Sequence, residues 1–155
     1  MTGTKPSMSL LEQIDKDVVK AMKERDKDRL SLLRVLKSDL KYKRIELGKD
    51  LTDEQAVEVL STSAKKHRES IEQFAKGGRD DLVKKEEFEL AVITTYLPKQ
   101  LDEHELRDLA AAAIAEAGAQ SPQQIGAVMK LLMPKIKGRA DGKAVNRMVA
   151  EMLAK

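Results

Sequence analysis

The chain contains no cysteine and no tryptophan, and its aromatic side chains are limited to two phenylalanines and two tyrosines. Without cysteine, it cannot form disulfides, thiolate zinc sites or a cysteine nucleophile, which fits a reducing compartment. A folded core must therefore be aliphatic. No apolar run reaches the roughly 18 residues of a membrane span, and the first residues lack the apolar segment of a signal peptide. We expect a cytoplasmic protein with no membrane partner.

What the chain does contain is charge, which makes up 35% of its 155 residues against 41% hydrophobic residues. This balance suits amphipathic helices whose outer faces are solvated. No stretch alternates with a period of two for long enough to indicate a strand. The sequence therefore predicts an all-α protein, long enough for one domain or two small ones.

Start and stop signals of helices recur along the chain. Thr52 with Gln55 and Asp102 with Glu105 have the spacing of a capping box, in which side chains at a helix start bond its free amides. Helices are expected to begin near Ser9, Asp26, Thr52, Asp80, Asp102, Ser121 and Asp141. The second to fifth are expected to end at Gly48, Gly77, Pro98 and Gly118. Pro134 is expected to stop or sharply redirect the sixth.

Charge and proline together predict a boundary at Leu97-Pro98-Lys99. Residues 1–98 are nearly neutral, with 20 Lys and Arg against 19 Asp and Glu, whereas residues 121–155 carry seven cations against two anions. We therefore expect an N-terminal helical domain over residues 1–97 and a small three-helix tail domain over residues 98–155.

The basic tail is the candidate nucleic-acid site, because clustered cations attract phosphate. Lys143 and Arg147 are four residues apart and share one helix face. Lys143 is also expected in a first turn, where free amides favour an anion. The candidate binding residues are Lys130, Lys135, Lys137, Arg139, Gly142, Lys143 and Arg147. The competing interpretation is that Asp141 caps the helix, Gly142 eases the turn, and the cations are merely solvated.

No catalytic or metal-binding pattern is found, and no cofactor or small-molecule substrate is expected. His67 and His104 lie among charged residues without a second histidine at ligand spacing, so we interpret both as solvated surface residues. The acidic residues of Arg79-Asp80-Asp81 and Glu86-Glu87 are interpreted as partners of helix dipoles rather than as cation ligands. No phosphate-binding or dinucleotide glycine loop is present.

Residues 121–149 resemble the tail module of the GatB/YqeY family. The shared pattern is G-x-V-M, followed by M-P-K-hydrophobic-K-G-[RK]-A-D-G-x-x-[VI]-N, and it begins here at Gly126 and ends at Asn146. The front of the chain resembles stand-alone YqeY-like proteins in three further runs: Ser9-Leu10-Leu11, Asp28-Arg29-Leu30-Ser31 with Leu33-Arg34, and Tyr96-Leu97-Pro98-Lys99-Gln100-Leu101. The resemblance runs from about Met8 to the end.

The resemblance implies a tRNA-binding accessory protein, related to the B subunit of the glutamine-dependent tRNA amidotransferase but without its catalytic part. Its expected partners are tRNA and the amidotransferase or other aminoacyl-tRNA synthesis machinery. Two alternatives stay open. One is a component of a carbon–nitrogen ligase that uses glutamine as amido-N-donor and needs partner subunits. The other is a helical protein–protein adaptor with an apolar surface of methionines, namely Met129, Met133, Met148 and Met152.

Overall fold

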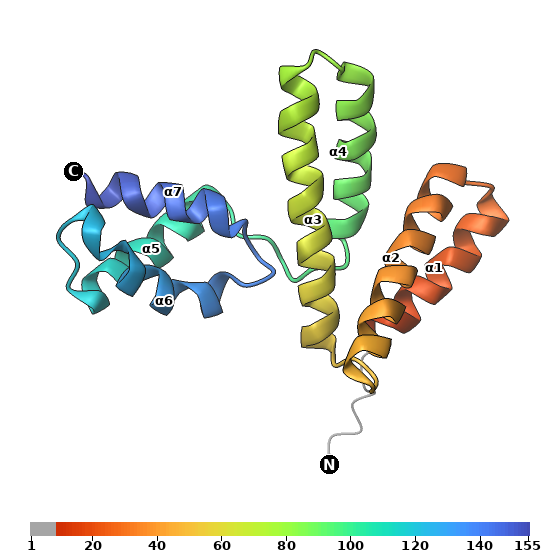
Figure 1. Ribbon diagram of the computed structural model, residues 1–155, viewed down its shortest axis with the longest axis horizontal. Helices are drawn as coiled ribbons and strands as arrows, with labels where there is room; N and C mark the ends of the chain where they lie inside the picture. The colour runs from red at the N-terminus through yellow and green to blue at the C-terminus, as the bar shows by residue number, and fades with distance from the viewer. Residues whose placement is uncertain (1–8) are drawn as a thin grey trace. The chain divides into compact units, whose positions relative to one another are not determined.

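The computed structural model describes residues 9–155, and these residues are all-α, as the sequence predicts (Figure 1). The helices are α1 (Leu10–Glu24), α2 (Lys27–Leu47), α3 (Asp53–Lys76), α4 (Asp80–Thr94), α5 (Glu103–Ala117), the short 3-10 helix η1 (Pro122–Gln124), α6 (Ile125–Ile136) and α7 (Gly142–Leu153). The chain divides into two compact units between Tyr96 and Leu97.

The first unit consists of two helical hairpins, α1 with α2 and α3 with α4 (Figure 1). Its buried side chains are almost all aliphatic: Ile14, Ala21, Leu32, Leu33, Leu36, Leu40, Ala56, Leu60, Ala64, Val92, Ile93 and Tyr96. The hydroxyl group of Tyr96 donates a hydrogen bond to the carboxylate of Asp17. This bond joins the end of the unit to α1.

The second unit is built from α5, α6 and α7, which enclose a separate aliphatic core. Its buried residues are Ala110, Ala113, Val128, Leu132, Ile136, Val145, Val149 and Leu153. On each helix these positions recur every three or four residues, which is the spacing that places them on one face. None of these core residues is polar, so every cation of the unit lies outside the core.

Several local predictions are confirmed at the helix ends. The side chain of Thr52 accepts a hydrogen bond from the Gln55 amide, and the Gln55 side chain accepts one from the Thr52 amide. Asp102 and Glu105 make the same reciprocal pair. Gly118 ends α5 in the left-handed region, with a φ of 65°. These contacts are local, so the sequence alone is sufficient to predict them.

The prediction that Pro134 stops or redirects its helix is wrong, because α6 continues through Ile136. Proline removes only its own amide and interferes with the carbonyl four residues earlier. The following residues keep their amides, and the Lys137 amide donates to the Met133 carbonyl at 3.0 Å. Ile136 is 1% exposed, so its burial in the core stabilises the last turn.

Three further details concern the last two helices and the residues before them. Ser121 leads first into η1 and only then into α6. Gly138, shortly after α6, has a positive φ of 74°, whereas Gly142 at the start of α7 does not have a positive φ. Asp141 does occupy the N-cap position of α7, but its side chain makes no capping hydrogen bond. The backbone φ and ψ of Asp141 are extended there, so the position itself does not require the side-chain bond.

Within residues 9–155, none of the helices combines the length and apolar character needed to cross a bilayer.

Candidate nucleic-acid interface

The connector between α6 and α7, residues 137–141, is fixed by contacts with the start of the second unit. The Leu101 amide donates to the Arg139 carbonyl at 2.9 Å, and the side-chain amide of Gln100 donates to the Gly138 carbonyl at 2.8 Å. Arg139 Nε in turn donates to the Lys99 carbonyl at 3.2 Å. The segment is therefore positioned by residues that lie about 40 positions earlier in the chain.

These contacts give Arg139 a structural role that the sequence did not reveal. One edge of its guanidinium holds the Lys99 carbonyl, and the rest of the group stays available because the side chain is only partly buried. Gln100 was not among the candidate residues, although it belongs to the Tyr96–Leu101 run that carries part of the family resemblance. Its contact with Gly138 depends on tertiary structure, so only the shared motif could have drawn attention to it.

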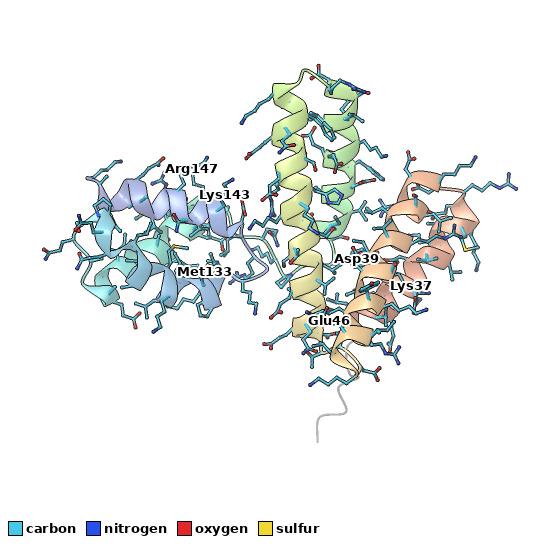
Figure 2. All side chains as sticks on the ribbon, in the orientation of Figure 1. Lys37, Asp39, Glu46, Met133, Lys143 and Arg147 are labelled. Atoms are coloured by element: carbon cyan, nitrogen blue, oxygen red, sulfur yellow. The ribbon has the colours of Figure 1, made fainter. Side chains whose placement is uncertain are left out.

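Lys143 and Arg147 are exposed neighbours on α7 (Figure 2). The opposite face of the helix contributes Val145 and Val149 to the core. Among the residues that the structure describes, neither cation has an ion-pair partner within 4.0 Å. Because the Asp141 side chain does not cap α7, the first-turn amides beside Lys143 also have no side-chain acceptor. Two exposed cations therefore lie beside a first turn whose N-cap side chain leaves the amides without its hydrogen bond.

The remaining candidates do not all join this group. Lys130 and Lys135 are both exposed on α6. They are five residues apart, which places them about 140° apart around the helix, so α6 does not present them on one face. Lys137 is the first residue of the connector and is exposed. The compact part of the candidate site is thus residues 137–147.

Gly142 does not need to be glycine for conformational reasons, because its φ is not positive. A Cβ atom added there would lie 3.6 Å from Met133 Cε, which is ordinary contact. The fold itself therefore does not require glycine at this position.

Negative charge in the second unit is concentrated on α5. Its charged contacts are local: Arg107 pairs with Glu103 at 3.0 Å, and His104 Nε2 lies 3.4 Å from the carboxylate of Asp108. The cations of α6 and α7 are thus on other helices than most of the acidic residues. The unit has an acidic helix and a basic pair of helices, and only the latter can attract phosphate.

A groove of about 410 Å³ also lies between α2 and α3 in the first unit. Its lining combines both signs of charge: Asp39, Tyr42, Lys43, Glu46, Glu58, Val59, Thr62, Ser63 and Lys66. Lys43 is already paired with Glu46 at 3.3 Å. With three carboxylates and two ammonium groups in its lining, this groove does not favour an anionic ligand.

The interpretation of His67 as a solvated surface residue is wrong, while His104 does lie on the surface. The His67 side chain is 16% exposed and sits between α3 and α4, whereas that of His104 is 85% exposed. The sequence neighbours of His67 are charged, but successive residues of a helix point in different directions. His67 instead follows Leu60 and Ala64 along the face of α3 that packs on α4.

The sequence of this chain matches the YqeY-like protein family over residues 11–153. The chain belongs to that family. It is similar to "Altered inheritance of mitochondria protein 41, mitochondrial" of Pyrenophora tritici-repentis, with 28% identity over 96% of this chain and 83% of the relative. The protein of the same name from Lachancea thermotolerans is 38% identical over 59% of this chain and 51% of the relative. An uncharacterized Schizosaccharomyces pombe protein is 36% identical over 56% and 70%, respectively.

Proposed function

We propose that this YqeY-like protein binds tRNA through α7 and the preceding connector, as an accessory factor that is not catalytic by itself. The observation that carries the proposal is the pair of unpartnered cations, Lys143 and Arg147, beside the uncapped first turn of α7. A phosphate group can be held there by two cations and by backbone amides at once. The tail-domain assignment of residues 98–155 and the amidotransferase-related partners belong to the same proposal.

Phosphate contacts dominate the affinity of proteins for nucleic acids and make it depend on salt. A site of this size supplies few contacts, so we expect modest, strongly salt-dependent binding without base specificity of its own. The expected cytoplasmic location is also part of this proposal. The fungal relatives carry the word "mitochondrial" in their names, and tRNA is present in both compartments.

The test is tRNA affinity as a function of salt for the full chain and for Lys143→Ala/Arg147→Ala. Each phosphate contact contributes about 0.7–0.9 to the slope of log affinity against log salt, so losing two should reduce the slope by roughly 1.4–1.8. Lys20→Ala/Lys23→Ala is the matched control, because it removes two exposed positive charges from α1. We expect the slope of this control to stay at the wild-type value.

A second variant, Lys137→Ala/Arg139→Ala, is expected to bind more weakly as well. Because Arg139 also donates a hydrogen bond to the Lys99 carbonyl, this substitution could disturb the fold. The helical content of the double variant must therefore be compared with that of the wild type by circular dichroism. If the Lys143/Arg147 variant is folded and keeps both affinity and slope, the proposed site is wrong. If the wild type binds no tRNA at low salt, the RNA-binding function is wrong as a whole, which favours the protein–protein adaptor.

A further inference from the structure

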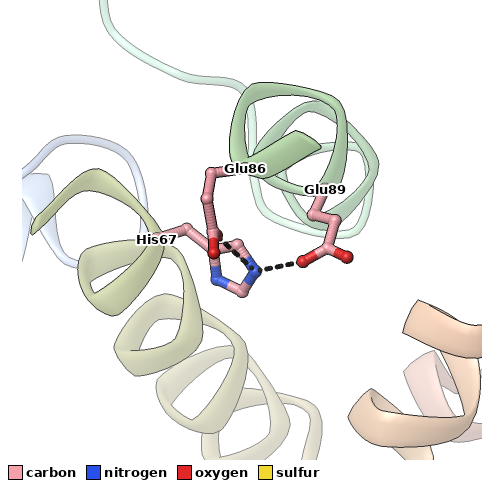
Figure 3. A group of neighbouring side chains, drawn as sticks. All are labelled: His67, Glu86 and Glu89. Atoms are coloured by element: carbon pink, nitrogen blue, oxygen red, sulfur yellow. Dashed lines mark hydrogen bonds and ion pairs between the residues drawn. The ribbon is translucent and has the colours of Figure 1, made fainter. Parts of the chain in front are cut away.

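A histidine and two glutamates meet on the inside of the α3–α4 hairpin (Figure 3). His67 comes from α3, whereas Glu86 and Glu89 are three residues apart on α4 and so share one helix face. Their side chains are only 16%, 21% and 20% exposed, respectively. Partial burial removes water from these carboxylates, so a positive charge placed between them would stabilise both.

The tautomer of His67 is set by a group outside this cluster. Its Nδ1 atom lies 2.8 Å from the backbone carbonyl of Ser63, which can only accept a hydrogen bond. Nδ1 therefore carries a proton, and in the neutral ring Nε2 has a lone pair. This arrangement, with one ring nitrogen donating to a carbonyl and the other free to coordinate, is the usual one for a metal-bound histidine.

Nε2 points at two carboxylates, with Glu89 Oε1 at 3.0 Å and Glu86 Oε2 at 3.4 Å (Figure 3). Within residues 9–155, these carboxylates form no ion pair with lysine or arginine. A protonated His67 would thus leave one negative charge uncompensated at close range. A divalent cation would balance both carboxylates while the imidazole stays neutral.

The distances also suit coordination. A tetrahedral ion with ligands at about 2.0–2.2 Å holds its ligand atoms about 3.3–3.6 Å apart. The two nitrogen–oxygen separations are 3.0 and 3.4 Å, and all three ligand atoms lie within 4.8 Å of one another. The separation from Glu86 lies within this range, and that from Glu89 is about 0.3 Å below it.

We propose that His67, Glu86 and Glu89 bind one divalent transition-metal ion of the Zn²⁺ class, with water completing its coordination. One imidazole nitrogen with two carboxylate oxygens is a ligand set of the zinc type. The proposal is independent of RNA binding, since these residues belong to the first unit.

The location gives such an ion a structural purpose. The buried residues of α3 are Ala56, Leu60 and Ala64, and those of α4 are Val92 and Ile93. All of them lie in the half of the hairpin that is far from the turn at Gly77. The half near Gly77 therefore has no fully buried side chain on either helix. A metal ion bound by both helices would hold α3 and α4 together in this half, because metal binding to the folded state adds to its stability.

The experiment uses the full chain, freed of metal with a chelator and then titrated with Zn²⁺ by calorimetry. We expect one bound equivalent and a rise in the thermal unfolding temperature measured by circular dichroism. His67→Ala and Glu89→Gln should each weaken binding by at least the roughly 10–100-fold seen when outer-shell partners are lost. His104→Ala is the matched control, because His104 Nε2 also lies 3.4 Å from a carboxylate, that of Asp108.

Binding that survives in His67→Ala and is lost in His104→Ala would overturn the proposal, and so would a wild type that binds no Zn²⁺, Co²⁺ or Mn²⁺. In either case His67, Glu86 and Glu89 would form only an ion-paired contact between the helices. Should His67→Ala fail to fold, nitrogen NMR of the wild-type histidines decides the matter. A Zn²⁺-induced shift of His67 Nε2 is expected, and a shift confined to His104 would contradict the assignment.

Discussion

Tyr96 offers the sharpest test of what holds the first unit together. Its side chain is 8% exposed, and its hydroxyl donates to the carboxylate of Asp17, which is 79 residues earlier in the chain. Burial, the hydrogen bond to Asp17 and the Asp17 charge together raise the pKa of Tyr96 well above its usual value of 10. Each of these effects disfavours the phenolate.

Tyr96→Phe removes this hydrogen bond and keeps the ring in place. A hydrogen bond to a charged group contributes about 1.5–3 kcal/mol. Asp17 is only partly buried, so water can replace part of the lost bond, and we expect a loss near the lower limit, about 1.5 kcal/mol. For a unit of this size, that corresponds to a fall in unfolding temperature of about 6–12 °C.

The same bond predicts how stability depends on pH. The pKa of Tyr96 is higher in the folded protein than in the unfolded chain, where it is near 10. Its contribution is therefore fully present below about pH 10 and is lost as the pH rises further, because the unfolded chain ionises first. Above pH 10 the wild type should lose stability more steeply than Tyr96→Phe does.

Thermal unfolding and hydrogen exchange of the α1 and α4 amides, measured at pH 7 and at pH 10 to 11, provide the assay. Tyr42→Phe is the matched control, since Tyr42 is 76% exposed. We expect this control to change the unfolding temperature little and to keep the steeper alkaline loss. If Tyr96→Phe behaves like Tyr42→Phe at both pH values, the bond between Tyr96 and Asp17 does not stabilise the fold and the reasoning is refuted.

Two further predictions concern the second unit. Leu132→Ala truncates a fully buried side chain. It should lower the free energy of unfolding of the second unit by about 2–5 kcal/mol, measured by hydrogen exchange of the amides of α5 to α7. It should leave the unfolding transition followed by tyrosine fluorescence unchanged, because Tyr42 and Tyr96 both lie in the first unit. The neighbouring control Met133→Ala, at 44% exposure, should cost far less, and equal effects would contradict the assigned core. Asp102→Ala should destabilise α5 by about 1 kcal/mol through loss of its cap, whereas Asp108→Ala should not, and the same exchange experiment separates the two.

The sequence determined the helical architecture because the signals that define it are local. A capping side chain such as Thr52 or Asp102 bonds amides within its own turn, and a glycine such as Gly118 ends a helix through its own φ. Helical spacing also placed Lys143 and Arg147 on one face of a helix, and both are exposed on α7 opposite the buried Val145 and Val149. None of these conclusions required knowledge of residues far away in the chain.

Tertiary structure alone decided three other features. Burial of Ile136 keeps α6 helical beyond Pro134. Contacts from Lys99 and Gln100 fix the connector of the candidate RNA site. Packing of α3 on α4 turned an apparently solvated His67 toward Glu86 and Glu89. Each depends on groups distant in sequence that meet only after folding, and no short window of sequence contains both partners.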